Sequence, residues 1–300
     1  MKTSIFSVSF AGLWGQHALT LEESIDKAAD LGFDGVEVMA KRPHLSPLDY
    51  SIDACKKLRE RFQERGIECS AVAGYTNFTG GSEFGEVPFG EMQIANVEAL
   101  AHRAAILGAR IVRVFTSYER DDMPFLTQWQ RNVEALRECA DRAASHEVMI
   151  GIQNHHDIGV ETKALDELIA QVDRPNIFPI WDYWSVFLGG EDLEAGARAM
   201  APKMRLTTVA DYILLARRKY RGDLVNYVKA DPPALLAVPM GSGDLDYETF
   251  FNALSKEGFD GWVSYENCSP IRGGGSLETL ESYARQFLDY MKPWVQAQSA

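Results

Sequence analysis

The chain has 300 residues, of which 46% are hydrophobic and 24% are charged, and its formal net charge at pH 7 is -13. The hydrophobic content is sufficient for a large core, and α/β barrels routinely reach this length as one domain. The acidic balance disfavours an endonuclease, because binding a phosphate backbone needs clusters of lysine and arginine. We therefore expect a protein without nucleic-acid partners.

Short apolar runs alternate along the chain with longer amphipathic segments, which predicts repeated strand–helix units and a parallel sheet. The predicted strands span residues 4–10, 36–39, 68–73, 111–116, 148–154, 177–182, 204–209 and 262–266. The predicted helices span residues 21–31, 52–65, 91–107, 128–145, 165–171, 193–200, 247–256 and 277–291. Eight such units close naturally into a (β/α)8 barrel, a single domain over residues 1–300. An open doubly wound sheet is disfavoured because no G-x-G-x-x-G motif follows the first strand.

Glycines separate several predicted helices from the strands that follow them. Residues 31–37 (LGFDGVE) and 257–263 (EGFDGWV) are near copies, and Gly66 and Gly108 precede the third and fourth strands. Glycine adopts the left-handed conformation that ends a helix at little cost, so that the next strand can begin. These junctions therefore support the repeated units.

Residues 210–246 form the longest segment without a predicted helix or strand. They follow the seventh predicted strand and include the basic run Arg217-Arg218-Lys219. An irregular segment of this length in a compact domain usually serves as a lid, a substrate wall or an oligomer contact. We therefore expect a long loop at about 210–246. If this loop serves as an oligomer contact, the protein is a homo-oligomer.

The cysteines and the apolar segments indicate the cellular compartment. The four cysteines are far apart and form no C-x-x-C pair, which is typical of reduced thiols in a cytosolic protein. No signal-peptide pattern precedes the first predicted strand, and no apolar run is long enough to span a bilayer. We expect a cytoplasmic protein that does not bind a membrane.

Polar residues stand at or just after the ends of several predicted strands. In a barrel of this kind, residues at the carboxyl ends of the strands usually carry the chemistry. The candidates are Glu37, Arg113, Gln153, His155, Asp182 and Glu266.

The order of these strand-end motifs resembles that of the xylose isomerase-like superfamily of sugar phosphate isomerases and epimerases. The motifs are residues 36–38 (VEV), 151–155 (GIQNH), 180–182 (IWD), 238–244 (VPMGSGD) and 261–266 (GWVSYE). The resemblance extends over nearly the whole chain. It implies a metal-assisted isomerase or epimerase, in which a divalent ion (Mn, Mg, Co or Zn) holds two oxygens of a sugar, keto-sugar or polyol. A nearby base then removes the proton alpha to a carbonyl.

The same resemblance implies a metal set of Glu, Asp, His and Glu at the ends of strands five to eight. Asp182 and Glu266 match this set, whereas Gln153 replaces a glutamate and Thr208 replaces the histidine. A glutamine oxygen can bind a hard cation, but it carries no charge. We therefore expect a divergent metal site formed by Gln153, Asp182 and Glu266, with an N-cap or turn role as the alternative for Asp182.

Glu266 and His155 are the expected catalytic residues. His155 and His156 are adjacent, and alternation along the strand with Gln153 favours His155. Because Gln153 cannot accept a proton, the two-carboxylate pair of an epimerase is lost, and a lyase or dehydratase is a serious alternative. A non-catalytic sugar-binding protein with a decayed metal site is the third possibility.

Four residues are expected to bind the substrate: Glu37, Arg113, Trp181 and Arg272. Pairing with Arg113 is the alternative for Glu37. Trp181 would offer an aromatic face to a sugar ring, and a place in the core is its alternative. Arg272 lies in the glycine-rich segment 270–276, whose backbone amides suit a phosphate or carboxylate; the alternative is a turn in which Ser276 caps the last helix.

Overall fold

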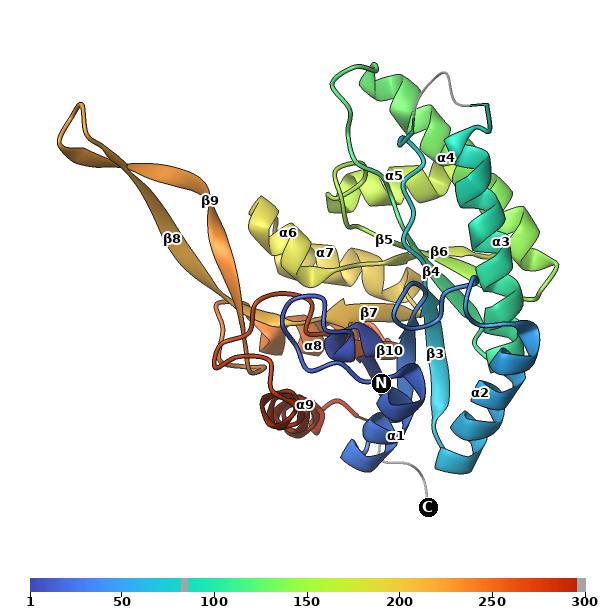
Figure 1. Ribbon diagram of the computed structural model, residues 1–300. Helices are drawn as coiled ribbons and strands as arrows, with labels where there is room; N and C mark the ends of the chain where they lie inside the picture. Colours follow the sequence, from blue (N-terminus) through green and yellow to red (C-terminus); the bar gives the residue numbers. More distant parts are fainter. Residues whose placement is uncertain (82–85, 296–300) are drawn as a thin grey trace.

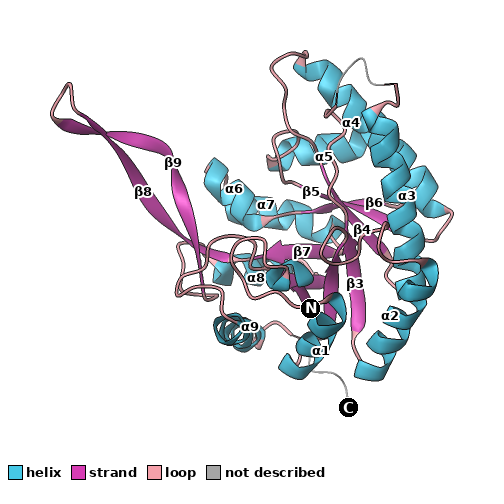
Figure 2. Ribbon diagram, viewed as in Figure 1, coloured by secondary structure: helices cyan, strands magenta, loops and turns pink. Residues whose placement is uncertain are grey.

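The structure is a computed structural model, which describes residues 1–81 and 86–295. Its centre is one sheet of eight parallel strands, with helices packed around the outside (Figures 1 and 2). The strands are β1 (Lys2–Phe6), β2 (Gly35–Met39), β3 (Glu68–Ala73), β4 (Ile111–Phe115), β5 (Met149–Gln153), β6 (Ile177–Ile180), β7 (Leu206–Val209) and β10 (Trp262–Tyr265). Their order in the sheet is β6-β5-β4-β3-β2-β1-β10-β7. The predicted (β/α)8 barrel is confirmed.

The helices lie close to their predicted positions. They are α1 (Leu21–Leu31), α2 (Ile52–Arg65), α3 (Phe89–Leu107), α4 (Phe125–Ala144), α5 (Thr162–Val172), α6 (Tyr183–Gly189), α7 (Leu193–Met200), α8 (Tyr247–Lys256) and α9 (Leu277–Met291). Gly32, Gly66 and Gly108 end α1, α2 and α3 with positive φ angles, as the glycine pattern indicated. Helix α6 was not predicted, because its seven residues are too few to show a clear period. No helix in the described residues is both long and apolar enough to cross a membrane.

The barrel is open along one seam in the described residues, because no backbone ladder joins β6 to β7. The carbonyls of Asn176 and Ile180 accept hydrogen bonds from Ile150 in β5 and from Asn154 just after it, at 2.8 and 3.4 Å. Backbone groups alternate in direction along a strand, so residue 179 faces the seam, and Pro179 has no N–H to donate there. The hydroxyl of Thr207 bridges the seam instead and donates to the carbonyl of Trp181 at 2.9 Å.

Two segments differ from the predicted elements. The first strand ends at Phe6, and Ser7–Phe10 form a 3-10 helix. The segment expected as a long loop contains an antiparallel hairpin, β8 (Asp211–Arg221) and β9 (Asn226–Val238), followed by a shorter irregular stretch before α8. The outer half of the hairpin is exposed on both faces, so its sequence lacks the alternation of apolar and polar residues that marks a half-buried strand.

Candidate functional site

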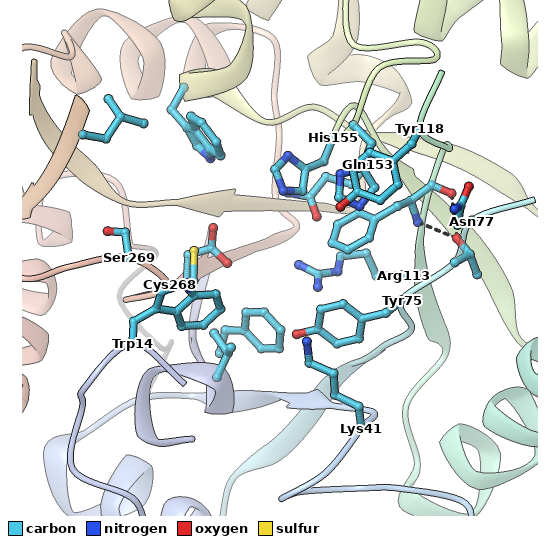
Figure 3. A pocket seen from close by; sticks show the side chains of 18 of the residues that line it. Trp14, Lys41, Tyr75, Asn77, Arg113, Tyr118, Gln153, His155, Cys268 and Ser269 are labelled. Atoms are coloured by element: carbon cyan, nitrogen blue, oxygen red, sulfur yellow. Dashed lines mark hydrogen bonds between the residues drawn. The ribbon is translucent and has the colours of Figure 1, made fainter. Parts of the chain in front are cut away.

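The carboxyl ends of the strands surround a cavity of about 510 Å³ (Figure 3). Its floor is formed by Arg113 from β4, Gln153 from β5 and Glu266, which follows β10. The walls are rich in aromatic side chains: Phe6, Trp14, Tyr75, Phe89, Phe115, Tyr118, Trp184 and Tyr212. The site therefore combines a few polar groups with an apolar wall, which is typical of small-molecule pockets.

Glu266 is the one carboxylate among the described residues that line the cavity. Its backbone N–H donates to the carbonyl of Val209 at 3.0 Å, which continues the β10–β7 ladder and fixes the side chain at the floor. Burial raises the pKa of Glu266 to about 7, although the charge of Arg113 acts in the opposite direction. A carboxylate with this pKa suits proton transfer near neutral pH.

Gln153, Asp182 and Thr208 form one hydrogen-bonded network below the cavity. The Nε2 atom of Gln153 donates to Oδ2 of Asp182 at 3.1 Å and to the hydroxyl of Thr208 at 2.9 Å. Asp182 also caps α6: its Oδ1 accepts from the backbone of Trp184 at 3.2 Å, and its Oδ2 accepts from the Ser185 hydroxyl at 3.1 Å. Burial, followed by the charge of Glu266, raises the pKa of Asp182 to about 8.

These contacts decide whether the expected divalent ion fits. Both oxygens of Asp182 are occupied by donors, and the amide hydrogens of Gln153 point at Asp182, an expected ligand, and at Thr208, which replaces the expected histidine. Oε1 of Gln153 is buried without a hydrogen-bond partner, and Glu266 is the one other carboxylate of the expected set. The described residues contain no group of three or more His, Cys, Asp or Glu that could hold a metal. The donor set does not fit a resident divalent ion, since it offers too few free anionic oxygens.

Glu37 and Arg113 form a buried pair, with Oε1 and Nε separated by 3.3 Å. The carboxylate of Glu37 is fully buried behind Arg113 and does not line the cavity. Burial raises the pKa of Glu37, and Arg113 opposes this shift. The guanidinium lies 4.5 Å from the Phe6 ring and points toward the cavity (Figure 3), and its Nη2 atom has no hydrogen-bond partner among the described residues. Arg113 therefore offers the cavity an unused cationic donor.

His155 and His156 both line the cavity, although alternation along the strand had favoured His155 over its neighbour. Strand β5 ends at Gln153, and His156 has a φ of 71°, so strand alternation no longer governs the two side chains. The rings pack against Trp184 and Tyr118, respectively. Burial lowers the pKa of His155 to about 3 and that of His156 to about 4, so both rings are neutral at pH 7.

The structure does not bring Trp181 or Arg272 to the cavity. Trp181 is fully buried between the sheet and the helices, where its Nε1 donates to Thr162 at 2.9 Å and its ring packs on Phe250. Arg272 is exposed and does not line the cavity. Ser276 accepts from the backbone N–H of Thr279 at 3.2 Å and caps α9, so the glycine-rich segment forms the capped turn that was its alternative.

Several polar or reactive cavity residues were not among the candidates, and they include Lys41, Tyr75, Tyr212 and Cys268. Lys41 Nζ lies 3.8 Å from the centre of the Tyr75 ring. Burial, helped by the nearby Arg113, lowers the pKa of Lys41. The positions of Lys41 and Tyr75 in the sequence could have identified them. They stand two residues beyond the ends of β2 and β3, just as His155 stands two residues beyond the end of β5.

The chain is similar in sequence to several proteins named as inosose dehydratases. It is 24% identical over 264 residues to an inosose dehydratase of Geobacillus thermodenitrificans (strain NG80-2), covering 83% of this chain and 82% of the relative. An inosose dehydratase of Lacticaseibacillus casei is also 24% identical, over 263 residues and with nearly the same coverage, 83% and 82%. Both relatives are enzymes, which confirms the prediction of an enzyme.

Solved structures share the fold over almost the whole chain. The IolI protein with a bound zinc atom is 18% identical and has a TM-score of 0.75. The match covers 99% of this chain and 100% of the IolI chain. The D-psicose 3-epimerase of Clostridium cellulolyticum H10, solved with D-tagatose, is 18% identical, with a TM-score of 0.74 and the same coverage. A profile of the family described as xylose isomerase-like TIM barrel matches residues 25–293, and the chain therefore belongs to this family.

Proposed function

We propose that this enzyme dehydrates a small keto-sugar or a ketone of a cyclic polyol. The observation that carries the proposal is that Glu266 is the one carboxylate lining the cavity in the described part of the chain. Epimerisation by two carboxylates needs one on each face of the substrate carbon, whereas elimination needs one base and a route for the leaving hydroxyl. The inosose dehydratases to which the chain is similar support the same reaction class.

In the proposed reaction, Glu266 removes the proton from the carbon alpha to the ketone. The guanidinium of Arg113, which lines the cavity, stabilises the negative charge that develops on the carbonyl oxygen. The hydroxyl on the next carbon then leaves as water, taking up the proton that Glu266 removed, and a conjugated ketone forms. In this proposal, Arg113 stabilises the negative charge, a role that we expected from a metal ion on the basis of the sequence.

The cavity wall supports a carbohydrate-sized ligand. Phe115, Tyr75 and Trp184 line the cavity together with the polar floor, and aromatic rings can pack against the C–H side of a sugar ring. His155 and His156, both neutral at pH 7, can donate or accept hydrogen bonds with hydroxyl groups.

Product analysis in deuterated water tests the proposal against an isomerase or epimerase. We expect a panel of ketoses and inososes to include a substrate that loses one water and gains the ultraviolet absorbance of a conjugated carbonyl. We expect Glu266→Gln to lower kcat by about 100-fold or more while keeping the fold and ligand binding, and the exposed control Glu278→Gln to change nothing. Deuterium uptake without loss of water would instead establish isomerisation or epimerisation. Ligand binding without turnover in the wild type would establish a sugar-binding protein.

The metal-assisted alternative has its own test. It requires Gln153 to turn Oε1 toward a cation, which breaks both hydrogen bonds of its amide nitrogen. We expect activity to survive a chelator and the purified enzyme to carry no stoichiometric Mn, Mg, Co or Zn. Loss of activity with a chelator and its return with one of these ions would restore the metal mechanism.

A further inference from the structure

The hairpin of β8 and β9 projects from the barrel as a separate two-stranded ribbon (Figures 1 and 2). We call residues 211–238 the hairpin arm. Its pairing runs from Asp211 and Val238 at the barrel to Arg221 and Asn226 near the tip. Eleven residues in β8 correspond to a length of about 35 Å. A two-stranded hairpin without packing partners is marginally stable in water, so a ribbon of this length is expected to rest on another surface.

The outer part of the arm exposes large apolar side chains. Leu224 and Val225 at the tip are 60% and 78% exposed, and Tyr220, Tyr227 and Val228 are exposed beside them. Scattered apolar residues on a surface are ordinary, but a contiguous group on one projecting element marks an interaction site. The arm therefore has the composition of a contact surface.

Charge identifies the partner. The arm contains five Lys or Arg and three Asp or Glu, a net charge of +2, so the remainder of the chain carries -15. Two of the arm's cationic side chains, Arg218 and Lys219, are exposed, and neither forms an ion pair or side-chain hydrogen bond within the described residues. A basic arm and an acidic barrel on the same chain are complementary between two copies.

We propose that the hairpin arm binds the barrel of a second copy of this chain, and that the second copy returns the same contact. Such a reciprocal contact closes under a twofold axis and gives a dimer. The unpaired cations of the arm would face acidic side chains of the partner barrel, and the apolar tip would be covered. This inference is independent of the reaction proposed above.

The proposed dimer contact would also affect the wall of the cavity. Tyr212 and Leu235 belong to the base of the arm and line the cavity of their own barrel. An arm held at its tip by a partner keeps this wall in place, whereas a free arm leaves it supported only at the base. Dimer formation would therefore stabilise the substrate pocket.

Sedimentation velocity on the purified full chain tests the proposal. We expect a species of twice 33.5 kDa that dissociates as ionic strength rises. We expect the charge reversal Arg218→Glu with Lys219→Glu, and separately the tip change Leu224→Ser with Val225→Ser, to weaken dimerisation by roughly tenfold or more. The control reverses two exposed lysines on the barrel helices, Lys163→Glu with Lys256→Glu, and should leave the dimer intact.

Circular dichroism and the unfolding midpoint of each variant show whether the barrel is folded, and the two arm variants alter different side chains, so a folding defect in one leaves the other informative. A wild type that is monomeric at every concentration and at low salt overturns the proposal. So does a wild-type dimer that both arm variants leave unchanged, because the interface would then lie elsewhere.

Discussion

At the residue scale, Arg113 and Glu37 form the most deeply buried ion pair of the described residues, because only 1% and 0% of their side chains are exposed. A buried guanidinium without its carboxylate is much less stable than the pair, so we expect Glu37→Ala to lower the free energy of unfolding by about 3–5 kcal/mol. Glu68, whose exposed carboxylate pairs with Lys2 at 2.6 Å, is the matched control, and Glu68→Ala should cost less than about 1 kcal/mol. Urea unfolding measures both. Equal losses in the two variants would contradict the prediction.

Sequence reasoning at this scale depended on where each strand ends. Gln153, Arg113 and Glu266 were expected at the cavity and lie there, because each stands within two residues of the end of a buried strand. Trp181 follows β6 just as closely, yet its ring turns into the core, because space between sheet and helix was available for it. The backbone direction after a strand depends on loop geometry that no local pattern encodes, as His156 with its positive φ illustrates.

At the scale of elements, the Gly-x-x-Gly junction occurs at residues 32–35 and 258–261, and its two glycines are needed for different physical reasons. Gly258 has a φ of 74° and open space around it, so its role is conformational. Gly261 begins the approach to β10, and a Cβ there would overlap the backbone carbonyl of Arg205, just as a Cβ on Gly35 would lie 2.6 Å from the carbonyl oxygen of Glu68. The second glycine of each copy therefore lets neighbouring strands pair.

We expect Gly261→Ala to be the more damaging substitution of the pair. Backbone cannot move aside as a flexible side chain can, so the loss should be about 3 kcal/mol or more, the upper part of the range for overpacking. Gly258→Ala should cost about 1–2 kcal/mol, the usual penalty for a left-handed alanine. Gly90→Ala in α3, which meets nothing within 4 Å, is the control and should be neutral or stabilising. Urea midpoints rank the three variants, and a larger loss for Gly258→Ala would refute this account.

Local patterns at the same scale predicted the barrel elements well and the hairpin arm poorly. Helices α1, α2, α7, α8 and α9 match the predicted residues, because each has one apolar face against the sheet. The arm packs on the barrel only at its base, so its sequence shows no periodicity that burial would impose. The proposed contact role of the arm could be inferred only from the exposure and charge of its side chains in the folded structure.

For the molecule as a whole, the buried carboxyl groups of the site and the acidic surface both lower the stability of the folded protein as the pH rises. Burial raises the pKa of Asp182 from 3.8 to about 8 and that of Glu266 from 4.5 to about 7. The folded protein therefore retains protons that the unfolded chain releases above about pH 4, and stability falls as the pH rises through this window. The net charge of -13 at pH 7 adds repulsion as further groups ionise. The two buried carboxyl groups thus lower the stability of the folded protein at neutral pH.

We expect the free energy of unfolding to decrease between about pH 5 and pH 8, by up to about 1.4 kcal/mol per pH unit for each group that is protonated in the folded state and ionised in the unfolded chain. Asp182→Asn removes one such group and keeps an oxygen that can accept from the Trp184 N–H, so its stability should fall less steeply over the same range. Asp121→Asn, at an exposed position, should retain the wild-type slope. Urea unfolding followed by tryptophan fluorescence at each pH measures the slopes. A wild-type stability that rises from pH 5 to pH 8, or a slope unchanged in Asp182→Asn, would show that Asp182 is ionised in the folded protein, and its oxygens would then be available to a cation after all.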